Sequence, residues 1–213
     1  MVDSRESITA KLCAFVRAWH AVSTRDKIFY DELAFDIMGR DEYKALYDFV
    51  SRGFSEQNAP FSREDTEQII MEYIAPIPLS RIHFSESRLE QFAAEHGKIQ
   101  YVICGAGADT FSFRNPNSDI EVFEIDHPDT QRYKKERIAD LEWNIPKNVH
   151  FVPVDFECEC MTEKLLDAGF ARVECINPPD LSAEEAMKPE RAKENISATT
   201  AEIISGYSGL APH

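Results

Sequence analysis

The chain has 213 residues and a formal net charge of −15 at pH 7, a length that fits one large domain or one domain with an appendage. Nucleic acids and anionic membranes bind patches of Lys and Arg, so the acidic balance excludes both as expected partners. The sequence has no run of about 20 apolar residues that predicts a membrane span, and its start does not resemble a signal peptide. Its five cysteines follow neither a disulfide nor a zinc pattern, so we expect a cytoplasmic protein without a metal site.

The first part of the chain is predicted to be helical. Residues 3–22 place apolar side chains at helical spacing, namely Ile8, Leu12, Phe15, Val16 and Trp19. In the segment that follows, Ser23 or Thr24 is a suitable cap for a short helix.

Further helices are predicted before the composition changes. "DEYKALYDFVSRGF" indicates a helix that ends at Gly53. The stretch up to Gly97 indicates two helices that are separated at Pro76 and Pro78. We therefore assign residues 1–97 to an N-terminal helical segment that serves as a lid.

Strands and helices alternate after this segment. "IQYVICGAG", "DIEVFEIDHP" and "NVHFVPVDFE" read as strands, "TQRYKKERIADL" and "MTEKLLDAGF" as helices, and "ARVECINPP" as a weaker fourth strand. This alternation is typical of a doubly wound α/β sheet. We assign residues 98–178 to a Rossmann-like core, and residues 179–213 to a polar tail that is helical or poorly structured.

A glycine turn follows the first predicted strand, in "YVICGAGADTFSFR". Gly105 and Gly107 allow a ligand to approach the backbone closely. A helix that starts just after them directs free N–H groups toward a polar ligand. The turn is therefore a candidate cradle for a cofactor; the competing interpretation is a turn that only packs helix against strand.

An acidic residue ends the second predicted strand. Twenty residues lie between Gly105 and Asp126, the spacing at which a doubly wound nucleotide-binding unit places its ribose-binding carboxylate. Glu124 is a second candidate on the same face of the strand, and Asp126 is favoured because it lies nearer the carboxyl end.

Thr110 occupies the position where a dinucleotide fingerprint has its third glycine. This residue disfavours a pyrophosphate, and with it an NAD-binding oxidoreductase. It suits a ligand that has a nucleoside but no diphosphate.

Three segments together resemble the leucine carboxyl methyltransferase family of S-adenosylmethionine-dependent enzymes. "VICGAGADTFSFR", "VFEIDHPDTQRYKKERI" and "FVPVDFE" are similar to the family patterns G-A-G-x-D-T-x-x-x-R, E-[VI]-D-x-P and V-x-x-D-[FL], in this order. "RDKIFYDELAFDIMG" also resembles the family's N-terminal D-x-x-A segment. The resemblance covers residues 25–170 and implies a class I methyltransferase fold with S-adenosylmethionine as cofactor.

The resemblance also implies roles for individual residues at the ends of the strands. Gly105, Ala106 and Gly107 would lie under the methionine part of the cofactor. Asp126 would accept hydrogen bonds from the ribose hydroxyls.

Other residues are placed around the rest of the cofactor by the same resemblance. Asp155 and Phe156 would flank the adenine, with Asp155 accepting from its amino group. Arg81 would grip the cofactor carboxylate, for which a fork of N–H donors is well suited. No catalytic residue is assigned.

Structural interpretations of these residues remain open. Arg81 can equally be a surface arginine near a proline turn, and Asp155 can cap the helix that follows it. Asp109 and Arg114 are expected to brace the glycine turn by pairing with each other or with the backbone.

The sequence departs from the family pattern beyond Phe170, where the expected acidic motif W-E-G-x-x-x-Y-L and later strands do not follow. We therefore expect a truncated Rossmann-like sheet with exposed strand edges, which favour a homodimer.

Two functions compete. The first is an S-adenosylmethionine-dependent O-methyltransferase acting on a carboxylate of a small molecule or protein. The second is a non-catalytic relative that acts by binding a partner.

Overall fold

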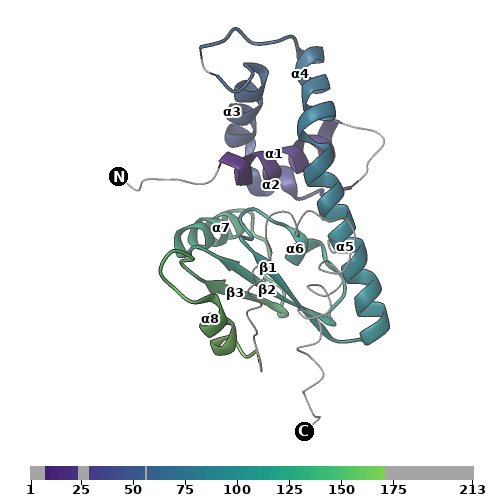
Figure 1. The fold of residues 1–213 in the computed structure, drawn as a ribbon, viewed down its shortest axis with the longest axis vertical. Coiled ribbons are helices and arrows are strands. Elements are labelled where there is room, and N and C mark those ends of the chain that lie inside the picture. The colour runs from purple at the N-terminus through teal and green to yellow at the C-terminus, as the bar shows by residue number, and fades with distance from the viewer. Residues whose placement is uncertain (1–7, 24–28, 56, 171–213) are drawn as a thin grey trace, which may run out of the picture.

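The computed structural model describes residues 8–23, 29–55 and 57–170, which form a helical part beside a parallel β-sheet (Figure 1). The helical part holds four α-helices, α1 (Ile8–Ser23), α2 (Ala34–Met38), α3 (Arg40–Ser51) and α4 (Arg63–Ile69). Their buried side chains form one core around Phe15 and Trp19. The helices predicted at residues 3–22 and 41–54 are confirmed where the structure describes them.

Two details of the predicted helix boundaries differ. Ser23 is the last residue of α1 and caps no following helix, and Thr24 lies outside the described residues. The short helix α2 has Leu33 at its N-cap position without a side-chain cap hydrogen bond.

The break predicted at Pro76 and Pro78 is wrong. A π-helical turn, η1 (Ile70–Ile74), joins α4 directly to α5 (Pro76–His96), and the three elements form one rod (Figure 1). The Ala75 N–H donates to the Ile70 carbonyl 2.8 Å away, five residues back instead of four. Pro76 starts α5, where its missing N–H costs no helical hydrogen bond, and the widened turn before it accommodates its ring. The predicted end at Gly97 is confirmed: its φ is +76° and its N–H donates to the Ala93 carbonyl.

Among the described residues, the sheet has three parallel strands in the order β1 (Ile99–Cys104), β2 (Ile120–Asp126) and β3 (Val149–Pro153). Three further helices follow these strands in turn, α6 (Phe111–Arg114), α7 (Pro128–Asp140) and α8 (Met161–Asp167). This strand order is that of one nucleotide-binding half of a doubly wound fold. The predicted fourth strand and the tail from residue 179 lie outside the described residues.

Alternate residues of β2 enter different cores on the two faces of the sheet. Val122 packs with Phe111 of α6 and Ala93 of α5 on one face. Phe123 and Leu165 of α8 belong to the core on the other face. Helices therefore cover both faces, and the side changes after β3, as expected of double winding.

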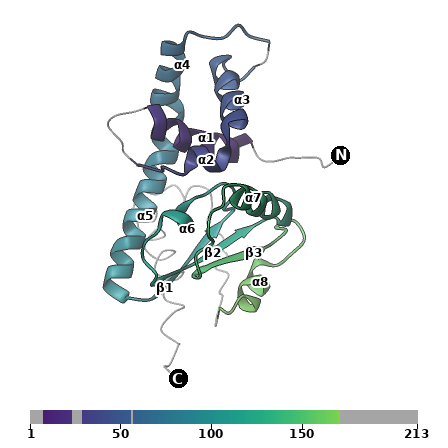
Figure 2. The same ribbon diagram turned by 180° about the vertical axis from the view of Figure 1, so that it is seen from behind.

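Helix α5 connects the two parts of the molecule (Figure 2). Leu79 in its first half belongs to the helical core, and Ala93 near its end belongs to the sheet core. A second link comes from α7, where the Arg137 guanidinium donates to the Asp36 carbonyl at 2.7 Å.

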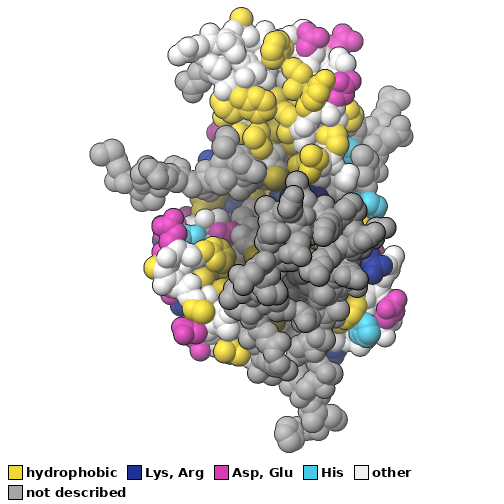
Figure 3. Space-filling view, viewed as in Figure 1, with side chains coloured by type: hydrophobic (Ala, Val, Ile, Leu, Met, Phe, Trp, Pro, Cys, Tyr) yellow, Lys and Arg dark blue, Asp and Glu magenta, His cyan; other side chains and the backbone are white. Residues whose placement is uncertain are grey.

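The outer surface of the helical part carries apolar side chains (Figure 3). Tyr73, Ile77 and Phe84 are 76%, 69% and 61% exposed, on the rod formed by η1 and α5. Across the described ranges, no helix is long and apolar enough to cross a membrane.

Candidate cofactor site

The carboxyl ends of the three strands place the predicted site residues along one edge of the sheet. The glycine turn begins directly after β1, Asp126 is the last residue of β2, and Asp155 follows β3 by two residues. In an open α/β sheet the ligand lies at this edge, because loops from adjacent strands meet there.

The glycine turn has a backbone that favours glycine. Gly105 has φ +69° and Gly107 has φ +46°, in the left-handed region that other residues enter only with strain. A Cβ built on Gly105 would meet no atom within 4 Å. The turn therefore presents open backbone on the outside, while the buried Ala106 anchors it inside.

Asp126 is joined to the glycine turn. One carboxylate oxygen accepts from the Gly107 N–H at 2.5 Å, and the other accepts from the His127 N–H at 2.7 Å. An ionised carboxylate has about four acceptor positions. Two backbone donors occupy two of them, so the half-buried carboxylate retains acceptor capacity for the hydroxyls of a ribose.

Glu124, the alternative ribose ligand, is buried away from this edge. Its side chain is fully shielded from solvent and binds the Ser112 hydroxyl and the Lys134 ammonium group. Removing one partner of such a buried pair typically costs about 3–5 kcal/mol. The Glu124 carboxylate is thus a structural link between β2, α6 and α7, which leaves Asp126 as the candidate at the strand end.

Asp155 and Phe156 begin the loop after β3. Asp155 accepts from the Glu157 N–H at 3.0 Å, and hydrogen bonding from the Cys158 thiol, followed by this backbone bond, lowers its pKa. The helix-cap interpretation is wrong, because α8 begins after Cys160 and the Asp155 carboxylate closes the preceding turn instead. The Phe156 ring is 49% exposed beside it, available to stack on a planar base.

Arg81 lies on α5 and is exposed. Its neighbour Ile82 packs against the same core as Ala108 of the glycine turn. Ser85, one helical turn later on nearly the same side, donates its hydroxyl to the Ile82 carbonyl at 3.0 Å. Within the described residues no ion pair or hydrogen bond occupies the Arg81 guanidinium, so it remains a candidate for an anionic group.

Two clefts lie elsewhere in the molecule. One of about 390 Å³ is lined by Gly39, Arg137 and neighbouring charged residues, and another of about 500 Å³ by Tyr43, Tyr47 and residues of α4. Neither contains a residue of the glycine turn. We favour the sheet edge over these clefts because the open backbone and the strand-end carboxylates meet only there among the three places.

Comparison with known proteins places this geometry in a family. The family model described as leucine carboxyl methyltransferase matches residues 10–175. A Bacillus subtilis (strain 168) protein, "Putative S-adenosyl-L-methionine-dependent methyltransferase YktD", is 35% identical over 183 residues, which are 80% of this chain and 59% of the relative. The chain belongs to the leucine carboxyl methyltransferase family.

A second member of the same functional class also matches. This S-adenosyl-L-methionine-dependent methyltransferase, named as putative, of Parafrankia sp. (strain EAN1pec) is 36% identical over 83 residues, which are 38% of this chain and 26% of the relative. The resemblance is thus confirmed, and S-adenosylmethionine is confirmed as the cofactor of the family. The chain spans 59% of the length of the Bacillus relative.

The residues at the sheet edge of this leucine carboxyl methyltransferase family member fit such a cofactor. Gly105 leaves open space above the backbone, and Asp126 retains acceptor positions. Phe156 offers an exposed ring. On α5, the exposed Arg81 guanidinium has no ion pair or hydrogen bond with another described residue. This set matches a molecule with an aromatic base, a ribose and a carboxylate, and it contains no cluster of cations for a diphosphate.

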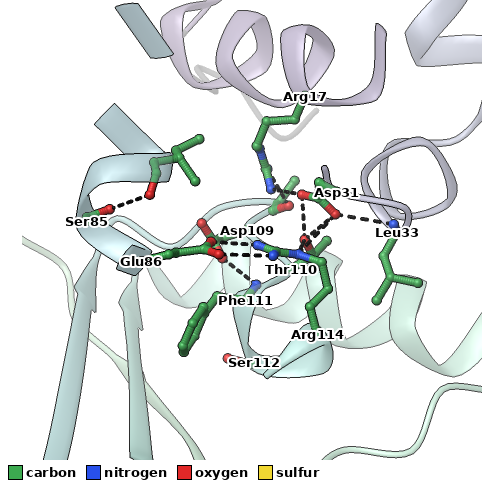
Figure 4. Close-up of polar contacts among 12 residues, drawn as sticks. Arg17, Asp31, Leu33, Ser85, Glu86, Asp109, Thr110, Phe111, Ser112 and Arg114 are labelled. Atoms are coloured by element: carbon green, nitrogen blue, oxygen red, sulfur yellow. Dashed lines mark hydrogen bonds and ion pairs between the residues drawn. The ribbon is translucent and has the colours of Figure 1, made fainter. Parts of the chain in front are cut away.

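One group of residues at the turn was not predicted from the sequence (Figure 4). Arg17 of α1, Asp31 before α2 and Glu86 of α5 converge on Thr110 and Arg114. Arg114 forms a two-pronged pair with Glu86, and it does not pair with Asp109 as one alternative expected. Thr110 and Arg114 are fixed positions of the G-A-G-x-D-T-x-x-x-R pattern, and Asp31 begins the D-x-x-A segment. No pattern in the sequence indicated that they pair with one another, or with Arg17 and Glu86.

Asp109 braces the turn through the backbone, as the other alternative expected. Its carboxylate accepts from the Phe111 N–H at 2.7 Å, and its own N–H donates to the Ala106 carbonyl at 2.7 Å. These bonds fix the chain between the glycines and α6.

Proposed function

We propose that this chain binds S-adenosylmethionine at the carboxyl edge of its sheet and acts as an O-methyltransferase on a carboxylate. The observation that carries the proposal is the meeting of the open glycine turn, the Asp126 carboxylate and the Asp155–Phe156 pair at one edge, in a member of the leucine carboxyl methyltransferase family.

The residues divide the work of binding. Asp126 would accept from the ribose hydroxyls while it continues to hold the Gly107 N–H. Asp155, which like an ordinary Asp is ionised at neutral pH, would accept from the adenine amino group. Arg81 would hold the carboxylate at the other end.

The chemistry requires little more than alignment. When bound, S-adenosylmethionine supplies a methyl group on a sulfonium, whose S–C bond breaks with its electron pair left on sulfur as an O–C bond forms to the acceptor. A carboxylate acceptor is ionised at neutral pH and has no proton to lose. The protein therefore needs to position two reactants and exclude water, and no acid–base pair is required.

Methyl transfer is tested with S-adenosylmethionine labelled in its methyl group. The chain is incubated with candidate carboxylates, both small acids and peptide C-termini, and the product is treated with base. A methyl ester releases labelled methanol under these conditions, whereas methyl groups on nitrogen or carbon stay bound. Labelled methanol above the level given by Asp126→Ala supports the proposal.

The second candidate function, a binding protein without catalysis, is separated by the same preparation. Binding of S-adenosylhomocysteine without methanol release from any acceptor would favour it over the enzyme.

A further inference from the structure

Asp31 is a buried carboxylate at the centre of the group shown in Figure 4. Its two oxygens accept from the Thr110 hydroxyl at 2.7 and 2.6 Å. It also accepts from Arg17 at 2.8 Å, and its ion pair with the Arg114 Nε spans 3.2 Å. The Thr110 hydroxyl has one proton, which the two oxygens share. Three side chains therefore meet on a residue that is 1% exposed.

The partners of Asp31 lead directly to the glycine turn. Arg17 uses its other terminal nitrogen to donate to the Ala108 carbonyl at 2.7 Å, inside the turn. Thr110 is the last residue before α6 and is itself fully buried. The N-terminal part of the chain thus holds the turn at two points, the Ala108 carbonyl and the Thr110 hydroxyl.

Two arginines and two carboxylates balance the charge of this group. Arg114 turns its terminal nitrogens to Glu86 at 2.7 and 3.1 Å and lies 4.9 Å from the centre of the Phe29 ring. Burial raises the pKa of Glu86, and the hydrogen bond from Arg114 opposes this shift. Each charge is partnered, so the group is rigid only while every member is present.

We propose that Asp31 is a positioning residue for cofactor binding, which acts through Thr110 and Arg17 to hold the glycine turn in its open shape. In this proposal the region around Asp31 is a fixed support for the glycine turn, and it does not open and close over the cofactor. Thr110 has a specific task in this arrangement: its hydroxyl donates to Asp31 and accepts from Arg114 at 2.9 Å. The proposal uses the proposed function for its ligand, but the shape of the turn is measurable without one.

The test compares variants that keep side-chain size. Thr110→Val removes the hydroxyl, Thr110→Ser retains it, and Asp31→Asn places an amide N–H₂ against groups that are themselves donors. Val50→Ala is the control, because it weakens the same helical core and removes none of the hydrogen bonds that hold the turn. Urea denaturation first establishes how much stability each variant loses.

Hydrogen exchange of the turn amides is the first measurement. The Gly107, Asp109 and Phe111 N–H groups are hydrogen-bonded in this structure, to Asp126, Ala106 and the Asp109 side chain. We expect exchange at these amides to accelerate at least about tenfold in Thr110→Val and Asp31→Asn, beyond the change in Val50→Ala, as expected for loss of a hydrogen bond to a charged group. Thr110→Ser should exchange like the parent chain.

Calorimetry with S-adenosylhomocysteine is the second measurement. Thr110→Val and Asp31→Asn should weaken binding about tenfold or more, and Thr110→Ser should restore it. Parent-like exchange and affinity in Thr110→Val, or losses that Val50→Ala reproduces at equal stability, would overturn the positioning role. If the parent chain binds no S-adenosylhomocysteine, the proposed function fails, and the exchange data still decide whether Asp31 holds the turn.

Discussion

Among single residues, one carboxylate of β2 has two tasks. Asp126 closes the glycine turn through the Gly107 N–H and faces the edge where the ribose is proposed to lie. Glu124 has the same side-chain chemistry and the same strand face, but its burial against Lys134 gives it a structural task. Two carboxylates of β2, two positions apart, thus have different roles because their surroundings differ.

Replacing Asp126 by Ala should weaken S-adenosylhomocysteine binding by about 1–3 kcal/mol, the usual cost of losing a hydrogen bond to a charged group. Titration calorimetry measures the change directly. Glu121→Gln is the matched control, since this carboxylate lies on the same strand, is half exposed and pairs with His150. Equal affinities of Asp126→Ala and the parent chain would remove Asp126 from the site.

Asp155 gives a prediction about pH. Its pKa lies below its ordinary value of about 3.8, because the Cys158 thiol and the Glu157 N–H hydrogen-bond its ionised form. The ionised form therefore stabilises the folded chain above the unfolded pKa, and this contribution is lost as pH falls through the folded pKa.

Two measurements check the Asp155 prediction. The carboxyl-carbon chemical shift should titrate with a midpoint below 3.8, and Cys158→Ala should move this midpoint upward. In acid unfolding, Asp155→Asn should lose less stability between neutral and low pH than the parent chain. A midpoint at or above the ordinary value would contradict the hydrogen bonding described for this loop.

At the element scale, the glycine turn is the element that decides between a cofactor cradle and a packing turn. Its outer side is open at Gly105, and its inner side is held by Asp126, Arg17 and Thr110. A turn needed only for packing would have its contacts on both sides.

Gly105→Ala should separate folding from binding. The new Cβ enters open space, so the fold should lose only about 1–2 kcal/mol from the left-handed φ. The methyl group would stand where the cofactor is proposed to lie, so affinity for S-adenosylhomocysteine should fall by more than tenfold. Gly53→Ala is the control, with φ +62° at the end of α3. Equal affinities in the two variants would indicate that the turn does not face the ligand.

The sequence predicted elements and the sheet edge better than it predicted their connections. Strand and helix periodicity and the spacing from Gly105 to Asp126 are local patterns. They predict the elements and the strand-end carboxylate because these features depend mainly on nearby residues. The helical rod continues through Pro76 because of a π-helical turn, and no local sequence pattern predicts such a turn. The Asp31–Thr110 contact joins residues 79 positions apart, and such pairs are not visible in one sequence, because nothing local records which distant charges will be buried together.

At the scale of the whole molecule, β1 and β3 are the outer strands of the described sheet. Outer strands offer backbone donors and acceptors to another chain. We propose a homodimer through such an edge. Light scattering after size exclusion should then give twice the chain mass, and the mass should fall on dilution. A constant single-chain mass across the concentration range would contradict the dimer.

The molecule also combines an N-terminal helical part, a doubly wound sheet and a glycine turn that is bonded to both. These features give the central claim: this chain binds a nucleoside cofactor without a diphosphate. Family membership supports the claim, and direct binding by this chain decides it.

Titration calorimetry of the folded chain with S-adenosylmethionine, S-adenosylhomocysteine and NAD is the most direct measurement. We expect saturable one-to-one binding of the two S-adenosyl ligands and no binding of NAD. Binding of NAD, or no binding of any of the three by a chain that melts cooperatively, would contradict the central claim.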